Sequence, residues 1–144
     1  MTDTISVLAA NLTGAALNWA VAVAEGYKSD SEQTEGDGLT VISPKGLFTS
    51  VSVRGAENGF GYRPSTNWSQ LGPLIEKHQV ALVAEAHDGM PGTERSLRWY
   101  ADVYYDGGQQ YTTEYCDTAL IAACRAIVVM HLGETVQVPK ELMP

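Results

Sequence analysis

Apolar side chains recur at helical spacing in three stretches of the chain, and the first stretch is residues 14–25. Because an α-helix turns once every 3.6 residues, its main apolar positions share one face: Leu17, Ala20, Val21 and Ala24. Thr13 is placed to cap the start of this helix, and Gly26 is placed to end it. The many small residues of this helix would let it pack closely on a sheet or on another helix.

The most apolar stretch is residues 118–132, which Asp117 or Thr118 could cap and Gly133 could close. A helix that is apolar on nearly all sides is normally buried at the centre of a domain. We therefore expect this helix to be buried against the sheet that contains residues 97–105.

A third helix is predicted over residues 66–79, with Ser65 or Thr66 as its cap. Its expected inner face consists of Trp68, Leu71, Ile75 and His78. Pro73 lies deep inside this stretch, where it lacks an amide donor and crowds the preceding turn. The helix is therefore expected to be kinked, or to begin near Pro73 after a turn.

Strands are predicted where β-branched residues are frequent or where apolar and polar residues alternate. The expected strands are residues 39–43 and 47–53, which form a hairpin, then 80–86, 97–105 and a short closing strand near 136–139. Strands that follow one another in the chain favour antiparallel pairing. The pattern therefore predicts an α+β fold, a small and mostly antiparallel sheet with about three helices packed on one face.

Residues 26–38 interrupt these patterns with four carboxylates, one lysine and no apolar periodicity. Such a segment buries too little surface to offset the entropy lost on ordering, so we expect a mobile acidic loop. An acidic metal-binding loop is the alternative, although the spacing of its carboxylates does not match the calcium-loop pattern.

Length and composition predict one domain that spans residues 1–144. The chain is 44% hydrophobic and 18% charged, which is ordinary for a domain with a single core. Nine Lys and Arg against seventeen Asp and Glu give a net charge of −8. Nucleic acids and anionic membranes are bound through basic surfaces, so the sequence disfavours both as partners. A protein that imitates the charge of DNA is still compatible with this composition.

Cys116 and Cys124 would lie roughly 12 Å apart if the chain between them were helical. A disulfide needs Cα atoms within about 7 Å, so we expect no internal bridge and a reducing compartment. The N-terminus does not resemble a signal peptide, and no apolar run approaches the ~18 residues of a membrane span. The sequence predicts a protein that is neither exported nor membrane-spanning.

The residue types that usually carry catalysis or bind metals show no recognised motif. His78, His87 and His131 are widely separated and lack metal-ligand spacing; His78 and His131 are interpreted as histidines at the edge of the core. No nucleophile elbow, local Cys–His signature or phosphate loop is present. The sequence therefore predicts no metal, no cofactor and no catalytic residues, and it favours a non-enzymatic role.

Arg125 is surrounded in the sequence by apolar neighbours. An unpaired buried guanidinium is very costly, so Arg125 must reach a carboxylate, carbonyls, solvent or an anionic ligand. A structural ion pair or a side chain that extends to solvent is one interpretation. Recognition of a carboxylate or phosphate ligand by the planar guanidinium is the other.

A second candidate site consists of two aromatic residues and the small polar residues between them: Tyr62, Ser65, Thr66, Asn67 and Trp68. They combine small hydrogen-bonding side chains with an expected helix start, where free amides and the helix dipole favour anions. Aromatic rings could stack on a planar group. The alternative is a helix cap with its flanking core aromatics.

Three stretches occur in the same order as in one known family: LTGAALNWAVA at 12–22, PSTNW and GPLIE at 64–68 and 72–76, and LIAACR at 120–125. Together with Tyr62, Gly133 and Glu134, they resemble the NinX-like family of bacteriophage accessory proteins. The resemblance implies a phage origin, an accessory role and a location in the host cytoplasm. It carries no established activity.

The favoured hypothesis is non-enzymatic binding or sequestration of a small anionic, nucleotide-like host ligand. It requires Arg125 to converge in space with the segment from Tyr62 to Trp68. The alternative is a protein–protein inhibitor that engages a host factor through an acidic surface. An enzyme is the third possibility, and assembly into a homo-oligomer is compatible with all three.

Overall fold

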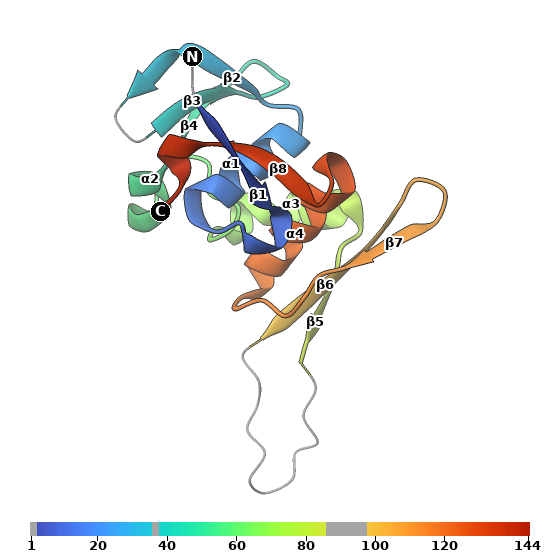
Figure 1. Cartoon of the computed structure of the whole chain (residues 1–144). Helices are drawn as coiled ribbons and strands as arrows, with labels where there is room; N and C mark the ends of the chain where they lie inside the picture. Colours follow the sequence, from blue (N-terminus) through green and yellow to red (C-terminus); the bar gives the residue numbers. More distant parts are fainter. Residues whose placement is uncertain (1–2, 36–37, 86–97) are drawn as a thin grey trace, which may run out of the picture.

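A computed structural model describes residues 3–35, 38–85 and 98–144 (Figure 1). The described residues contain four α-helices: α1 (Gly14–Ala24), α2 (Val53–Asn58), α3 (Trp68–His78) and α4 (Ala119–Leu132). Two 3-10 turns, η1 (Ala9–Asn11) and η2 (Lys140–Leu142), lie near the two ends of the chain. The same residues contain eight strands: β1 (Thr4–Leu8), β2 (Lys28–Glu35), β3 (Gly38–Ile42), β4 (Phe48–Ser52), β5 (Ala81–Ala84), β6 (Trp99–Tyr105), β7 (Gln109–Thr112) and β8 (Thr135–Pro139).

Helix α4 lies at the centre of the fold and contacts α1, α3, β5, β6, β7 and β8. Nine of its fourteen residues are buried, because its sequence is apolar on nearly every side. Thr118 caps the helix, with its side chain accepting a hydrogen bond from the Ile121 amide, and Gly133 follows the last turn. The prediction of a buried helix packed on the strand now called β6 is confirmed.

Helix α1 packs beside α4 through small side chains. Ala15, Ala16 and Ala20 are buried, and their size allows the two helices to approach closely. Thr13 occupies the cap position, but its side chain makes no capping hydrogen bond, contrary to the prediction. Gly26, with φ of +88°, turns the chain away from the helix as predicted.

The strands form three small antiparallel sheets rather than one: β1–β8, β2–β3–β4 and β5–β6–β7. The α+β class is confirmed, but the single sheet with helices on one face is not. Figure 1 shows the β2–β3–β4 and β5–β6–β7 sheets at opposite ends of the molecule, with helices between them. Strands β1, β2 and β7 were not predicted; β1 pairs with β8, β2 with β3 and β7 with β6.

The segment predicted as a mobile acidic loop, residues 26–38, contains strand β2 instead; residues 36 and 37 lie outside the described ones. Strand β2 pairs with β3 and forms one edge of its sheet, with a register shift between Asp30 and Thr34. Backbone pairing at a sheet edge does not require apolar side chains, and polar edge strands are common. This is why composition alone misidentified the segment.

The other strand predictions are largely confirmed. Strands β3 and β4 form the expected hairpin, and β8 is the expected closing strand. In β6, Ala101 and Val103 are buried as the alternation predicted. The predicted strands 80–86 and 97–105 correspond to β5 and β6, while positions 86 and 97 lie outside the described residues. Cys116 and Cys124 are buried and free, as expected.

Two short-range features were misread. Helix α2 was not predicted; the Ser52 side chain accepts a hydrogen bond from the Gly55 amide and caps it. Trp68 was assigned to the inner face of α3, yet its side chain is 57% exposed. Helix α3 runs unbroken through Pro73.

Within the described residues, no helix is long and apolar enough to cross a membrane.

Candidate functional site

The segment that precedes α3 is tied to the rest of the fold at both of its ends. The Tyr62 amide donates to the Ser50 carbonyl at 2.8 Å, which attaches the segment to β4. The Ser65 amide donates to Oδ1 of the buried Asn18 at 3.0 Å, which attaches it to α1. Gly61 has a φ of +74°, and an added Cβ would lie 2.5 Å from the Ser50 carbonyl oxygen. The segment is therefore a fixed connection between β4 and α1.

The predicted site residues of this segment serve mainly to begin helix α3. Asn67 is the cap, since its Oδ1 accepts from the Gln70 amide at 3.0 Å; the predicted caps Ser65 and Thr66 do not fill this role. Ser65 is buried, Thr66 is exposed and Trp68 points largely into solvent. Asn67 fits the cap interpretation, whereas the exposed Trp68 is not the core aromatic that this interpretation includes.

Arg125 lies on α4 and bonds to atoms of its own chain. Its Nε donates to the Leu12 carbonyl at 3.0 Å, and its Nη1 donates to Sγ of Cys116 at 3.3 Å. The side chain is half-buried. These contacts connect α4 to the turn before α1 and to the segment that leads into α4. In the described residues, Arg125 therefore acts as an anchor, and no contact brings it to the segment from Tyr62 to Trp68.

One cleft does include a predicted site residue, Tyr62. It lies between the end of α1, the β3–β4 turn and helix α3, and its volume is about 670 Å³. The side chains that give it chemical character are Glu25, Tyr27, Lys45, Phe48, Tyr62 and Lys77. Arg125 and Trp68 do not line it. The structure thus separates the two halves of the site that the sequence predicted.

An aromatic pair forms part of the cleft wall. The rings of Tyr27 and Tyr62 are 4.9 Å apart between centroids and are tilted by 36°. Burial raises the pKa of Tyr62, and the nearby Tyr27 and Glu25 raise it further. Burial and the charge of Glu25 raise the pKa of Tyr27 as well. Both hydroxyl groups therefore stay protonated near neutral pH and keep a donor for hydrogen bonding.

The cleft carries a different charge from the whole molecule. Two lysines, Lys45 and Lys77, line it against one carboxylate, Glu25, whereas the chain has a net charge of −8. Lys77 Nζ lies 2.9 Å from Oε1 of Glu25, and its side chain is 62% exposed. Lys45 lies on the exposed turn between β3 and β4. The cleft is therefore locally cationic in an acidic protein.

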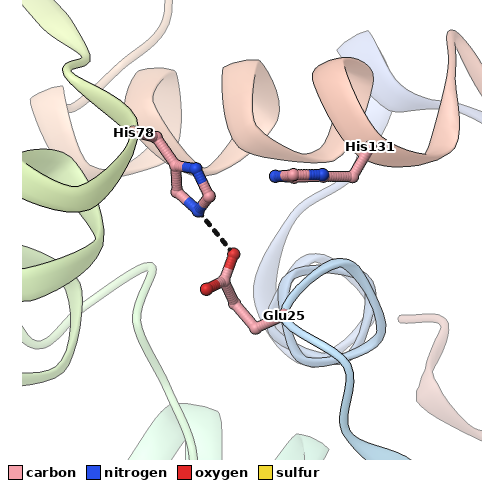
Figure 2. A group of neighbouring side chains, drawn as sticks. All are labelled: Glu25, His78 and His131. Carbon is pink, nitrogen blue, oxygen red and sulfur yellow. Dashed lines mark hydrogen bonds and ion pairs between the residues drawn. The ribbon is translucent and has the colours of Figure 1, made fainter.

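Beside the cleft, three titratable side chains meet at the ends of three helices. Glu25 follows the last residue of α1, His78 ends α3 and His131 lies in the last turn of α4. Figure 2 shows the carboxylate of Glu25 directed toward His78, with the His131 ring beside both. His78 Nε2 lies 2.7 Å from Oε2 of Glu25, and the two imidazole centroids are 4.8 Å apart. We call these three residues the Glu-His-His cluster.

The surroundings of the Glu-His-His cluster favour an ionised carboxylate and a neutral His131. Burial alone would raise the pKa of Glu25, but hydrogen bonds from Lys77 and His78 outweigh it and hold the pKa below its usual 4.5. Burial lowers the pKa of His131, and the neighbouring His78 lowers it further. A carboxylate and a neutral imidazole are both donors of lone pairs to a cation.

This cluster could not be recognised from the sequence. No spacing motif links its members, because each one comes from a different helix and is far from the others in the chain. The available signal was positional. All three lie at or just beyond the C-terminal end of a helix, but only the fold shows that these three ends meet.

The comparison with protein families identifies the group to which the chain belongs. A sequence profile for the family described as "Bacteriophage P22, NinX" matches residues 9–131. This chain belongs to that family. The match to the NinX family confirms the resemblance and spans both the cleft and the Glu-His-His cluster. A search among curated proteins found no match.

Proposed function

We propose that this NinX-family chain binds, and thereby sequesters, a small planar anion of the nucleotide class in the cleft beside Tyr62. The setting is that of a phage accessory protein in the host cytoplasm. The observation that carries the proposal is the combination of an aromatic pair and two lysines in one cleft of about 670 Å³. The proposal is one of binding, and it includes no chemical step.

The size of the cleft suits a small molecule. Clefts that bind small ligands usually measure roughly 300–1,000 Å³. The walls come from three separate parts of the chain, and the Tyr62 wall is fixed by hydrogen bonds to β4 and α1. A largely preformed wall lowers the entropic cost of binding.

The lining chemistry favours a ligand with a planar part and an anionic part. The rings of Tyr27 and Tyr62, with the 60% exposed Phe48, offer apolar faces to a base or a similar planar group. Lys45 is placed on the rim to meet a phosphate as a mobile positive charge. Lys77 is already paired with Glu25, so Lys45 is expected to supply most of the attraction.

Native mass spectrometry of the full chain purified from infected cells tests the proposal. We expect the wild-type chain to carry a small-molecule adduct that Lys45→Gln loses. Lys45 is exposed on a turn, so this substitution should leave the fold intact. The matched control is Lys140→Gln, which removes an exposed lysine outside the cleft and should keep the adduct.

Two results would contradict this function. A wild-type chain without any small-molecule adduct would remove the reason to assign a ligand to the cleft. An adduct that Lys45→Gln retains in full would place the ligand elsewhere. A captured host protein in place of a small molecule would support the alternative, an inhibitor that uses its acidic surface.

A further inference from the structure

The Glu-His-His cluster brings together one carboxylate and two imidazoles, with Lys77 on the carboxylate oxygen that faces away from His78. Their potential ligand atoms all lie within 4.8 Å of one another (Figure 2). We infer that Glu25, His78 and His131 form a binding site for a divalent transition metal ion of the zinc class. This inference is independent of the proposed ligand, because it rests on the convergence of three helix ends and not on the cleft.

The distances are close to those that one ion would require. Zinc binds imidazole nitrogen and carboxylate oxygen at about 2.0–2.2 Å, so two tetrahedral ligands lie roughly 3.3–3.6 Å apart and never more than about 4.4 Å. The His78–Glu25 contact of 2.7 Å must therefore lengthen slightly, while His131 moves inward. Because His131 is exposed at the end of α4, its ring can adjust without disturbing the core.

The neighbouring lysine orients the carboxylate. Lys77 holds Oε1 of Glu25 at 2.9 Å, which leaves Oε2 directed toward His78. Partners that hold the second oxygen of a ligating carboxylate are typical of protein metal sites. The positive charge of Lys77 opposes the ion, and the 62% exposure of its side chain lets water reduce this repulsion.

The ligand types select the class of metal. Two imidazoles and one carboxylate suit zinc and related transition metals, whereas magnesium and calcium prefer oxygen ligands throughout. Three protein ligands leave a fourth tetrahedral position for water or another donor. Because Glu25 also lines the cleft, a bound ion would lie at its edge.

A simpler interpretation treats the cluster as a carboxylate–histidine pair with a second histidine packed against it. It explains the Glu25–His78 contact fully, but it assigns no role to the position of His131. The two interpretations therefore differ over His131. A metal site requires this side chain, and a structural pair does not.

Calorimetric titration of the full chain with zinc, after removal of metals by a chelator, tests the inference. We expect one ion per chain in the wild type and at least 100-fold weaker binding in His131→Ala. His131 is exposed, so this variant should fold, which circular dichroism would verify. The matched control Glu76→Gln removes an exposed carboxylate of α3 outside the cluster and should bind zinc as the wild type does.

A second measurement needs no variant. In nitrogen NMR spectra of the imidazole rings, zinc should shift the ligating nitrogens of His78 and His131 together. The inference is overturned if the wild type binds no zinc, if His131→Ala binds it with unchanged affinity, or if only the His87 ring responds. A joint response of His78 and His131 in the wild type supports it even where a variant fails to fold.

Discussion

Helix α4 carries two polar positions that are satisfied in opposite ways. At Arg125, donors of the guanidinium meet an acceptor carbonyl and a thiol of the same chain. At His131, in the last turn of the helix, the imidazole lies beside the Glu25–His78 pair, and the potential ligand atoms of the three side chains lie within 4.8 Å of one another. The first arrangement is complete within the chain, as expected of a structural contact. The second would be completed by a cation.

The difference teaches where a function can be placed. A charged residue among apolar neighbours suggests a ligand site in the sequence. Its hydrogen-bond donors can nevertheless be satisfied within the chain, as those of Arg125 are by the Leu12 carbonyl and the Cys116 thiol. The Glu-His-His cluster and the neighbouring cleft consist of residues that look ordinary in the sequence. The following predictions test this contrast, from the largest expected effect to the smallest.

Gly61→Ala, next to the cleft residue Tyr62, should cause the largest loss of stability. The new Cβ would lie 2.5 Å from the Ser50 carbonyl oxygen at a φ of +74°. Backbone strain of about 1–2 kcal/mol adds to the cost of overpacking, so we expect a loss of about 3 kcal/mol in the free energy of unfolding. Gly59→Ala is the matched control, since Gly59 also has a positive φ but an added Cβ there would meet only the Arg63 side chain, at 4.0 Å. Equal losses in urea unfolding of the two variants would contradict the account.

Zinc should stabilise the chain through the Glu-His-His cluster. At a free concentration 100 times its Kd, an ion that binds only the folded state raises the free energy of unfolding by about 2.7 kcal/mol. Thermal unfolding at rising zinc concentration should show this increase in the wild type and in Arg125→Lys. It should fall to about 0.4 kcal/mol or less in His131→Ala, whose binding is expected to be at least 100-fold weaker, and an undiminished increase there would count against the cluster.

Arg125→Ala should destabilise the fold without affecting the cleft. Loss of the hydrogen bonds to Leu12 and Cys116 should cost about 2 kcal/mol, the usual range for charged donors. Arg125→Lys keeps the charge but cannot place two donors in the same geometry, so we expect an intermediate loss. Chemical denaturation measures both. A variant that unfolds like the wild type would show that Arg125 is not the anchor described here.

Asn67→Ala should weaken the start of α3 by about 1 kcal/mol, because the Asn67 side chain caps the Gln70 amide. Thr13→Ala provides the comparison, since Thr13 occupies the cap position of α1 without a capping hydrogen bond. Its substitution should change the free energy of unfolding by no more than a few tenths of a kcal/mol. Similar costs for both would mean that the two caps had been assigned wrongly.

The smallest expected effect is a loss of fold stability at acidic pH. The folded-state pKa of Glu25 lies below its usual 4.5, so the ionised carboxylate stabilises the fold above that pH and loses this contribution as the pH falls below it. Hydrogen bonds from Lys77 and His78 hold the pKa of Glu25 down, and His131 lies beside the carboxylate. His131, whose pKa is also lowered, loses its part of the stability earlier, as the pH falls below about 6.5.

Urea unfolding at a series of pH values measures this dependence. Below pH 4.5, the free energy of unfolding should fall less in Glu25→Gln than in the wild type. Glu76→Gln should follow the wild type, because Glu76 is an exposed carboxylate outside the cluster. An identical acid dependence in all three chains would mean that the Glu25 contacts contribute nothing to stability.

Local patterns predicted the elements that a single stretch of sequence determines. The apolar surface of α4 and the alternation in β6 both led to the correct element and the correct packing partner. The hairpin of β3 and β4 followed from its turn residues and β-branched strands. In each case the signal lies within about fifteen consecutive residues, where periodicity can be read directly.

Features that depend on distant residues could not be predicted in this way. Strand β2 is polar and is held by backbone pairing with β3. Strand β1 pairs with β8, which lies near the other end of the chain. Tyr62 was assigned to a ligand site, and it does line the cleft. The rest of the cleft lining comes from the end of α1, the β3–β4 turn and α3, and the Glu-His-His cluster forms only where the ends of α1, α3 and α4 meet.

The central claim is that the binding chemistry of this chain lies at the cleft and not around Arg125. The most direct measurement is a two-dimensional amide NMR spectrum of the labelled, chelator-treated chain after addition of the small-molecule fraction from infected cells. The account predicts shifts confined to the cleft, at Tyr27, Lys45, Tyr62 and their neighbours. Shifts centred on Leu12, Cys116 and Arg125, or no shifts at all, would contradict it.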